Sequence, residues 1–213
     1  MMGKVIILPQ TTRNPITTIG CMAGICWNSD TTDDEKNYKR GLSCLEKNHG
    51  RVLEFINTEM VIDGYSARTI REWYTHIGGA PTRLQASTRY IDYSEFGYVT
   101  PPSIAKHIEA DRAYKDVMAA ISDTMYILDK LGMPREDVAM LLPLGMCTKI
   151  VDKRNLRSLI DMSRVRMCQR AYWEYRCLIS DIRNELSKLD DEWKYIVDNF
   201  ICARCDECNE ECF

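Results

Sequence analysis

Residues 155–187 constrain the fold more than any other part of the sequence, because they form a long helical pattern that is apolar on every side. The apolar residues are spread around the helix rather than gathered on one face: Leu156, Leu159, Ile160, Met162, Val165, Met167, Ala171, Trp173 and Leu178. Such a helix must be covered all round, either at the centre of a domain or between subunits. At about 100° per residue, Arg157 and Arg166 project from different sides of it. Unpaired buried charge is costly, so both arginines are expected to face anionic partners.

A second long helix is predicted from about residue 102 to residue 131. Pro101 and Pro102 open this helix, and Gly132 and Pro134 stop it. Its apolar residues recur at helical spacing and are expected to form part of the core. They are Ile104, Ile108, Val117, Ala120, Ile121, Met125 and Leu128. The helix is therefore predicted to have a structural role.

Shorter elements precede the second helix. The sequence predicts a buried strand at about residues 4–8 and a segment rich in β-forming residues at about residues 55–62. It also predicts three helices, at about residues 15–27, 34–48 and 67–76. Together with the long helices, these elements predict an α+β fold. We expect one domain over residues 1–200 and a cysteine-rich tail over residues 201–213.

The composition argues against several functional classes. Of the 213 residues, 45% are apolar and 28% are charged, which is typical of globular proteins. The formal net charge of −3 and the pI near 5.7 argue against a general binder of nucleic acids or membrane surfaces. The sequence has no apolar run long enough to predict a transmembrane helix, and its first apolar stretch is too short for a signal peptide. A cytoplasmic protein is the resulting expectation.

The segment from Thr82 to Tyr90 is dense in hydrogen-bond donors and follows the pair Gly78-Gly79. It contains two arginines, a glutamine amide and several hydroxyl groups. The planar fork of arginine matches phosphate, and hydroxyl groups can complete such a site. From local chemistry alone, the alternative is a polar edge strand or loop without a ligand.

Residues 85–90 read Gln-Ala-Ser-Thr-Arg-Tyr, which resembles the nucleotide-binding Q-x-S-x-R-Y segment of the flavin-dependent thymidylate synthases. Other segments resemble the same family in the same order. They are Cys26–Ser29, Asn48–Phe55 with His49 and Glu54 in register, Trp73–Ile77, the Leu-Pro-Leu at 142–144, and Asn155–Leu159. The resemblance extends across most of the chain.

The resemblance implies an enzyme that transfers one carbon from methylenetetrahydrofolate to C5 of dUMP. FAD would carry the hydride and NADPH would reduce it, because flavin enzymes take their difficult chemistry from the cofactor. The family also implies the fold of the thymidylate synthase complementing proteins, with a mixed sheet and long helices. A homotetramer with sites between subunits is implied as well.

The resemblance also implies roles for particular residues. The nucleotide would be held by Gln85, Ser87, Thr88 and Arg89, with Arg89 as the phosphate clamp. Arg166 matches the catalytic arginine that faces the pyrimidine and favours the form ionised at N3. Glu72 stands at another nucleotide-binding position. The family needs no cysteine nucleophile, so Ser87 is interpreted as a phosphate ligand.

A second set of positions is implied for the flavin: His49, Arg51, Thr75, His76, Asn155, Arg157 and Asp161. The expected start of a helix at Asn155 would add free backbone N–H groups, which bind anions.

Several positions depart from the family pattern. The two arginines of the family's Arg-His-Arg triplet are Thr75 and Ile77 here, Glu72 replaces a glutamine, and Ala139 stands where the family has a phosphate-binding arginine. Four basic residues could restore the lost charge: Arg51, Arg83, Lys149 and Arg154. These departures leave open a related reaction, such as hydroxymethylation or the use of dCMP. They also leave open a nucleotide-binding homologue that has lost the flavin.

The ten cysteines divide into two groups. Six are scattered and are expected to be small buried residues. Cys202, Cys205, Cys208 and Cys212 have the spacing C-x2-C-x2-C-x3-C, which suits a zinc ion or an iron–sulfur cluster. An unliganded tail is the alternative, and the acidic neighbours disfavour an anionic cluster.

Overall fold

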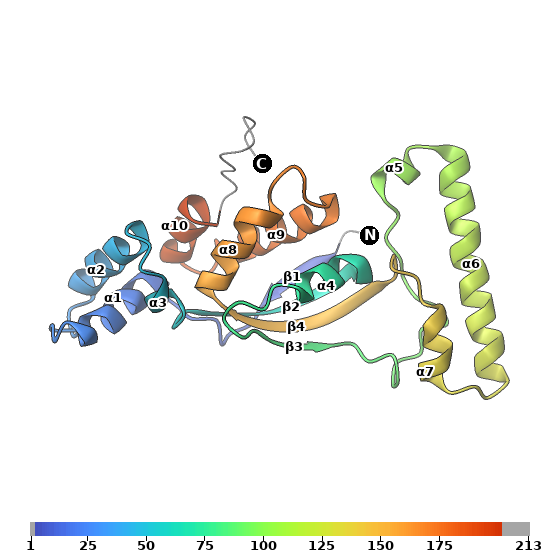
Figure 1. Cartoon of the computed structure of the whole chain (residues 1–213), viewed down its shortest axis with the longest axis horizontal. Helices are drawn as coiled ribbons and strands as arrows, with labels where there is room; N and C mark the ends of the chain where they lie inside the picture. The colour runs from blue at the N-terminus through green and yellow to red at the C-terminus, as the bar shows by residue number, and fades with distance from the viewer. Residues whose placement is uncertain (1–2, 202–213) are drawn as a thin grey trace.

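The computed structural model describes residues 3–201, and its centre is a sheet of four strands. The strands are β1 (Lys4–Ile7), β2 (Asn57–Ser66), β3 (Thr82–Gln85) and β4 (Cys147–Asn155), in the order β1-β2-β4-β3. All neighbouring strands run antiparallel, so the α+β class is confirmed but the expected mixed sheet is not. Figure 1 shows the sheet across the middle of the molecule.

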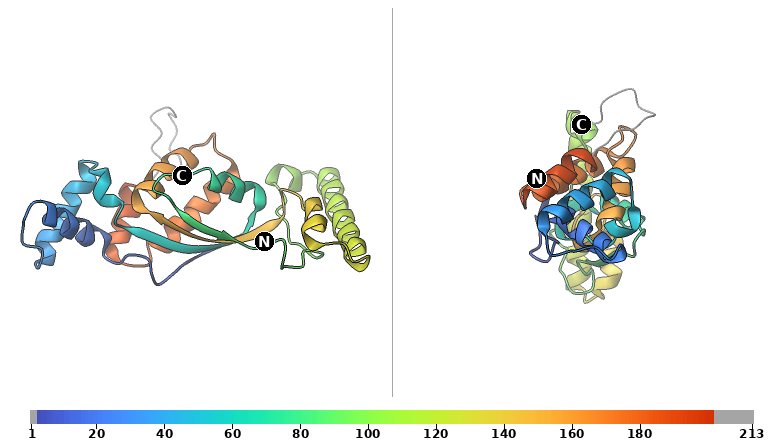
Figure 2. Two further views of the ribbon diagram at one scale, coloured as in Figure 1. Left: turned by 60° about the horizontal axis from the view of Figure 1, so that its bottom comes forward. Right: turned by 90° about the vertical axis from the view of Figure 1, so that its left-hand side faces the viewer.

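One face of the sheet is covered by helices (Figures 1 and 2). These are α4 (Ala67–Tyr74), α8 (Leu156–Arg166), α9 (Trp173–Leu186) and α10 (Asp191–Asn199). Residues of β2 alternate between buried and partly exposed positions, which is the period of a strand with one covered face. The fully buried side chains that fill this interface come from both layers: Met60, Ile62, Ile70, Trp73, Leu156, Leu159, Tyr175, Ile179 and Ile182.

Two strands lead directly into helices, and a polar cap marks each junction. The Ser66 hydroxyl accepts a hydrogen bond from the Thr69 amide at 3.2 Å, and the Asn155 side chain accepts one from the Ser158 amide at 2.8 Å. In the register of β2 and β4, Ser66 lies opposite Cys147, and Asn57 lies opposite Asn155. Helices α4 and α8 therefore begin at opposite ends of the same strand pair.

The predicted helix over residues 155–187 is divided into α8 and α9 by a non-helical segment at residues 167–172. The segment contains no proline or glycine, so local sequence gives no signal for the break. The expected burial is confirmed for most of its apolar residues, including Met162 and Leu178. It is wrong for Val165, which is exposed.

A helical hairpin lies at one end of the sheet (Figure 1). It consists of α1 (Pro15–Cys26) and α2 (Asp34–Glu46), followed by the short α3 (Gly50–Leu53). A Cβ atom at Gly20 would lie 1.7 Å from the Asn37 carbonyl oxygen. The two helices can pack this closely because glycine has no side chain.

An arm extends from the opposite end of the sheet (Figures 1 and 2). It contains α5 (Pro102–Ala105), α6 (Ile108–Lys130), α7 (Arg135–Val138) and a 3-10 turn (Ala139–Leu141). Within the described chain, Met118 and Met125 are the buried residues of α6.

The prediction that the apolar stripe of this helix is core is therefore wrong for most of the stripe. Ile108 is 87% exposed, Val117 is 56% exposed and Ala120 is also exposed, whereas Ile104, Ile121 and Leu128 are partly buried. The stripe exists, but few elements of the same protomer cover it.

Among residues 3–201, no disulfide bond joins two of the cysteines. The expectation of burial is confirmed for Cys44 and wrong for Cys26, which is exposed, while the other four are partly buried. In the described part of the chain, no helix combines the length and apolar character needed to cross a membrane.

Candidate functional site

Two stacked aromatic rings lie between the sheet and the covering helices, and each carries an arginine. Trp73 of α4 and Tyr175 of α9 have ring centroids 6.0 Å apart. The Arg154 guanidinium lies 3.9 Å from the centre of the Trp73 ring, and the Arg166 guanidinium lies 4.9 Å from that of Tyr175. Both arginines are therefore fixed by cation–π contacts on the same aromatic stack.

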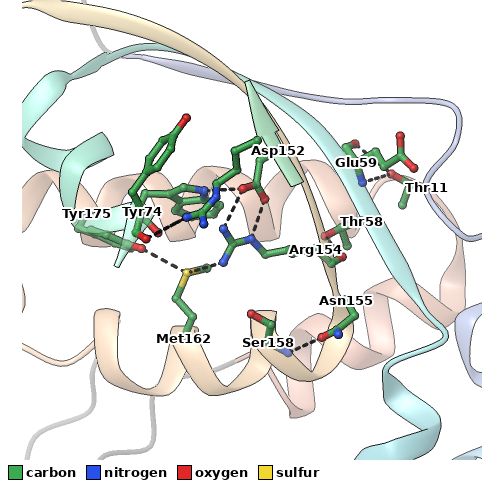
Figure 3. A network of polar contacts seen from close by, with 12 residues as sticks. Thr11, Thr58, Glu59, Tyr74, Asp152, Arg154, Asn155, Ser158, Met162 and Tyr175 are labelled. Atoms are coloured by element: carbon green, nitrogen blue, oxygen red, sulfur yellow. Dashed lines mark hydrogen bonds and ion pairs between the residues drawn. The ribbon is translucent and has the colours of Figure 1, made fainter. Parts of the chain in front are cut away.

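Arg154 is completely occupied by contacts inside the protein. Its Nε and Nη2 atoms donate to the two carboxylate oxygens of Asp152 at 2.7 and 2.9 Å, and its Nη1 atom donates to the Met162 sulfur at 3.0 Å. Figure 3 shows Arg154 between these two residues. Both charged side chains are 0% exposed. The expectation that Arg154 supplies charge to a ligand site is therefore wrong, because Asp152 neutralises it within the core.

Arg166 has a more open environment at the end of α8. Its Nε atom donates to His76 Nε2 at 2.9 Å, and its Nη1 atom donates to Glu72 Oε2 at 2.8 Å. Its side chain remains 22% exposed. The positive charge is therefore paired and oriented, yet it stays within reach of a ligand.

His76 is held in its neutral form. Burial and the positive charge of Arg166 lower its pKa from 6.5 to about 4. A neutral imidazole can accept the hydrogen bond from Arg166 at Nε2 when its proton is on Nδ1.

The segment expected to bind the nucleotide lies toward the arm. Gln85 Nε2 donates to the Thr148 hydroxyl at 3.2 Å, and Ser87 Oγ accepts from the Arg89 amide at 3.2 Å. The Arg89 Nε atom lies 3.1 Å from a carboxylate oxygen of Glu136 in α7, and its side chain is 67% exposed. Thr88 is exposed. These residues are near one another, but Arg89 and Arg166 belong to different clusters within the protomer.

The residues expected to bind the flavin come together in part, around the first turn of α8. The Arg157 Nη1 atom lies 2.7 Å from Glu54 Oε1, and Arg51 lies 3.6 Å from the other oxygen of the same carboxylate. His49 precedes α3, where a Cβ atom on Gly50 would lie 3.0 Å from the Arg157 side chain.

Asn155, the N-cap residue of α8, lies close to the backbone at Gly79. Gly79 has a φ angle of +72°, and a Cβ atom there would lie 2.2 Å from Asn155 Nδ2. Glycine therefore permits both the backbone conformation and the close approach. A cavity of about 440 Å³ beside α3 is lined by His49, Arg51 and Trp27, among other residues, which is within the size range of ligand pockets.

Other expected site residues lie elsewhere. The imidazole of His76 contacts Arg166 rather than the first turn of α8. Thr75 is exposed, and its hydroxyl donates to the Glu72 carbonyl at 2.7 Å. Asp161 is exposed on α8.

Besides Arg154, two more of the basic residues considered as replacements for the lost arginines have structural contacts. Arg83 Nη1 donates to the Tyr74 carbonyl at 3.0 Å, at the end of α4, and its guanidinium lies 4.5 Å from the centre of the Tyr74 ring. Lys149 lies 3.0 Å from a carboxylate oxygen of Asp63 on the neighbouring strand. Arg51 is the replacement that lies among the residues expected to bind the flavin.

Sequence reasoning missed two polar groups that lie on α4 or contact its first turn. Arg68 lies 3.8 Å from Glu72 Oε1, and its guanidinium lies 4.3 Å from the centre of the Tyr172 ring. Its spacing of four residues from Glu72 on one helix was a detectable signal. Glu174 is buried and accepts hydrogen bonds from the Ser66 amide at 2.6 Å and the Thr69 hydroxyl at 2.8 Å. Nothing in the local sequence indicated this contact, because the partners lie more than 100 residues apart.

In the portion of the chain that the structure describes, no group of three or more His, Cys, Asp or Glu residues is arranged to hold a metal ion. The predicted metal ligands Cys202, Cys205, Cys208 and Cys212 lie outside the described residues.

Comparison with known proteins gives a consistent result. A family model described as thymidylate synthase complementing protein matches residues 7–190. The chain is 30% identical to a flavin-dependent thymidylate synthase from Geobacter sulfurreducens, over 81% of this chain and 78% of that protein. It is 27% identical to one from Clostridium tetani, over 97% of this chain and 92% of that protein.

A relative from Nitratidesulfovibrio vulgaris, also a flavin-dependent thymidylate synthase, is 32% identical over 64% of this chain and 58% of its own length. Among solved structures, the fold is similar to that of thymidylate synthase X from Helicobacter pylori, crystallised with FAD and dUMP. The TM-score is 0.71 with 16% identity, and the match covers 94% of this chain and 99% of that one.

Proposed function

Because the chain belongs to the thymidylate synthase complementing protein family, we propose that it transfers a one-carbon unit from methylenetetrahydrofolate to C5 of dUMP. The observation that carries this proposal is the Arg166 cluster. Its guanidinium is oriented by Tyr175, His76 and Glu72, and it is partly exposed. A fixed positive charge aimed at developing negative charge is an effective way to stabilise a transition state.

Arg166 would act on the pyrimidine itself. A positive charge beside the ring favours the form ionised at N3, which enriches C5 in electron density and makes it a better nucleophile. The guanidinium needs little reorganisation for this role, because two hydrogen bonds and an aromatic face already hold it.

The residues around the first turn of α8 would hold FAD. His49, Arg51, Asn155 and Arg157 offer positive charge, hydrogen-bond donors and a helix N-terminus to its phosphates. When bound, the flavin would supply the hydride chemistry that the side chains lack. NADPH would serve as the reductant and methylenetetrahydrofolate as the carbon donor.

Assembly of the protein into a homotetramer would complete the site. Arg89 contacts Glu136 in the arm, whereas Arg166 contacts Glu72 and His76 over the sheet, so one protomer does not join them. The exposed apolar stripe of α6 supports association. In the proposed assembly, Arg89 of one subunit binds the phosphate of a nucleotide whose base meets Arg166 of another.

The proposal can be tested on freshly purified protein. We expect flavin absorbance at about 450 nm. With NADPH supplied as the reductant, we expect transfer of label from labelled methylenetetrahydrofolate to dUMP, giving dTMP. Label transfer to dCMP in preference to dUMP would identify a different pyrimidine substrate, and a hydroxymethyl product would identify a different reaction. A colourless protein that binds dUMP, and that stays inactive after incubation with FAD, would contradict the catalytic proposal.

A further inference from the structure

Among the described residues, the guanidinium group of Arg166 has partners on several sides and none on the remaining one. The Tyr175 ring lies against one face, His76 occupies Nε and Glu72 occupies Nη1. Within residues 3–201, no hydrogen bond of Arg166 Nη2 is found, and the side chain is 22% exposed. The side that no described residue occupies is therefore the edge that carries Nη2 and the second N–H of Nη1.

We infer that Glu72 and His76 are positioning residues, which act on the substrate through Arg166 by leaving its Nη1–Nη2 edge free to bind a planar group with two adjacent acceptors. N3 and an oxygen of an ionised pyrimidine form such a group. This inference rests on the proposed function. It replaces the roles expected from the sequence, in which Glu72 touches the nucleotide and His76 touches the flavin.

The donor capacity of arginine supports this assignment. Arginine has one N–H on Nε and two on each Nη atom, arranged in a rigid plane. The contacts with His76 and Glu72 use one N–H on Nε and one on Nη1. The N–H groups that remain on Nη1 and Nη2 can form the parallel pair of hydrogen bonds that arginine makes with planar acceptors.

His76 suits this role because it is neutral. An imidazolium could not accept a hydrogen bond from a guanidinium, and it would repel it. Burial and the charge of Arg166 lower the pKa of His76 to about 4, so Nε2 remains an acceptor at neutral pH.

Glu72 has two opposing effects. As an acceptor it orients Nη1, and as an anion it offsets part of the positive charge that Arg166 offers to a nucleotide. Its other oxygen lies 3.8 Å from Arg68, one turn earlier on the same helix. Glutamine at position 72 would keep an acceptor of the same length and remove the negative charge. Glu72→Gln should therefore bind an anionic nucleotide more tightly than the parent does.

The test compares two pairs of variants in the flavin-loaded, full-length protein: Glu72→Gln with Glu72→Ala, and His76→Gln with His76→Ala. Calorimetry measures the Kd for dUMP, absorbance measures the flavin content, and steady-state kinetics separate kcat from KM. Glu59→Gln is the matched control, because Glu59 forms a comparable partly buried ion pair with Lys153 at 3.1 Å, on the sheet.

We expect Glu72→Gln to lower the Kd for dUMP by about threefold to tenfold, while Glu72→Ala binds about tenfold more weakly than Glu72→Gln. His76→Ala should raise the Kd by about tenfold, and His76→Gln should restore most of the loss because its amide oxygen can accept from Nε. Each alanine variant should also lower kcat, with unchanged flavin content. The control should leave the Kd, kcat and flavin content at parental values.

The failures are distinguishable. If the parent binds dUMP and all four variants bind it equally well, the positioning roles are wrong while the proposed function stands. If His76→Ala loses flavin but keeps its affinity for dUMP, His76 is a flavin ligand and the inference is overturned. If the parent itself does not bind dUMP, the proposed function fails, and the inference fails with it.

Discussion

Arg154 and Arg166 lie on the two members of one aromatic stack, yet they occupy opposite kinds of site. Arg154 lies on Trp73 with every guanidinium nitrogen engaged and 0% of its side chain exposed. Arg166 lies on Tyr175 with one edge free of contacts from the described residues. The difference shows that burial of an arginine on an aromatic ring does not by itself mark a binding site. An arginine in such a position can bind a ligand only where some of its N–H donors are left unoccupied by the protein.

The positions of the two arginines in the chain explain this difference. Asp152 and Arg154 are two residues apart on β4, so their side chains project to the same covered face and pair there. Arg166 ends α8, where its neighbours come from the end of α4 and the ring of Tyr175. A strand residue facing the core is enclosed, whereas a residue at a helix end remains accessible.

The largest predicted effect concerns the stability of the enclosed arginine. Arg154→Ala should lower the free energy of unfolding by about 3–5 kcal/mol, because it leaves the Asp152 carboxylate buried without its partner. Denaturant unfolding at a fixed protein concentration measures this change. Lys153→Ala, at an exposed neighbouring position, is the control and should change stability by less than about 1 kcal/mol. Equal effects from the two substitutions would show that the buried pair has no special structural role.

Arg166→Ala should give the opposite result, with a large loss of activity and a small loss of stability. We expect turnover to fall by about 10²–10³-fold, as when one group that stabilises transition-state charge is removed. The free energy of unfolding should change by about 1 kcal/mol or less, because the ion pair with Glu72 is partly exposed. If Arg166→Ala lowered the free energy of unfolding as much as Arg154→Ala does, the distinction between the two arginines would be lost.

Arg89 tests whether the arm belongs to the same site. Arg89→Ala should weaken dUMP binding by about 2 kcal/mol, roughly 30-fold, because a charge-assisted hydrogen bond to phosphate is lost. Calorimetry with Arg112→Ala as the control, an exposed arginine on α6, measures the difference. Unchanged affinity in Arg89→Ala would remove the phosphate-clamp assignment.

The last predicted effect should appear in the pH dependence of stability, over a limited range of pH. The folded pKa of His76 is about 4, below the unfolded value of 6.5, because of burial and the charges of Arg166, Arg154 and Arg83. The unfolded chain therefore binds the proton more readily between these values. The stability associated with the neutral imidazole is complete above about pH 6.5 and is lost as the pH falls toward 4.

His76→Gln should flatten the stability curve between pH 6.5 and pH 4, because glutamine does not titrate. Unfolding curves of the parent and the variant, measured at several pH values in this range, give the comparison. Parallel curves would show that His76 is not held in its neutral form by the fold.

The sequence predicts much of the fold, since strong local signals survive in the structure. Ser66 and Asn155 are polar residues at strand-to-helix junctions, and both cap the helix that follows. The predicted region around Asn155 also brings together His49, Arg51 and Arg157.

The remaining features depend on contacts that no local pattern encodes. Residues 167–172 break the predicted helix without proline or glycine, so tertiary packing decides the break. The stripe on α6 is apolar, but a sequence does not state which chain covers it. The pairing of Arg166 with Glu72 joins residues 94 positions apart. The pairing of Arg154 with Asp152, in contrast, follows from strand periodicity and could have been predicted.

A crystal structure of the flavin-loaded assembly with dUMP bound would test the central claim most directly, through the distance from Arg166 Nη2 to the nearest pyrimidine nitrogen or oxygen. We predict about 2.7–3.2 Å, the range of a hydrogen bond, with Arg154 still paired to Asp152. A pyrimidine bound away from Arg166, while its guanidinium keeps its contacts with Glu72 and His76, would contradict the account.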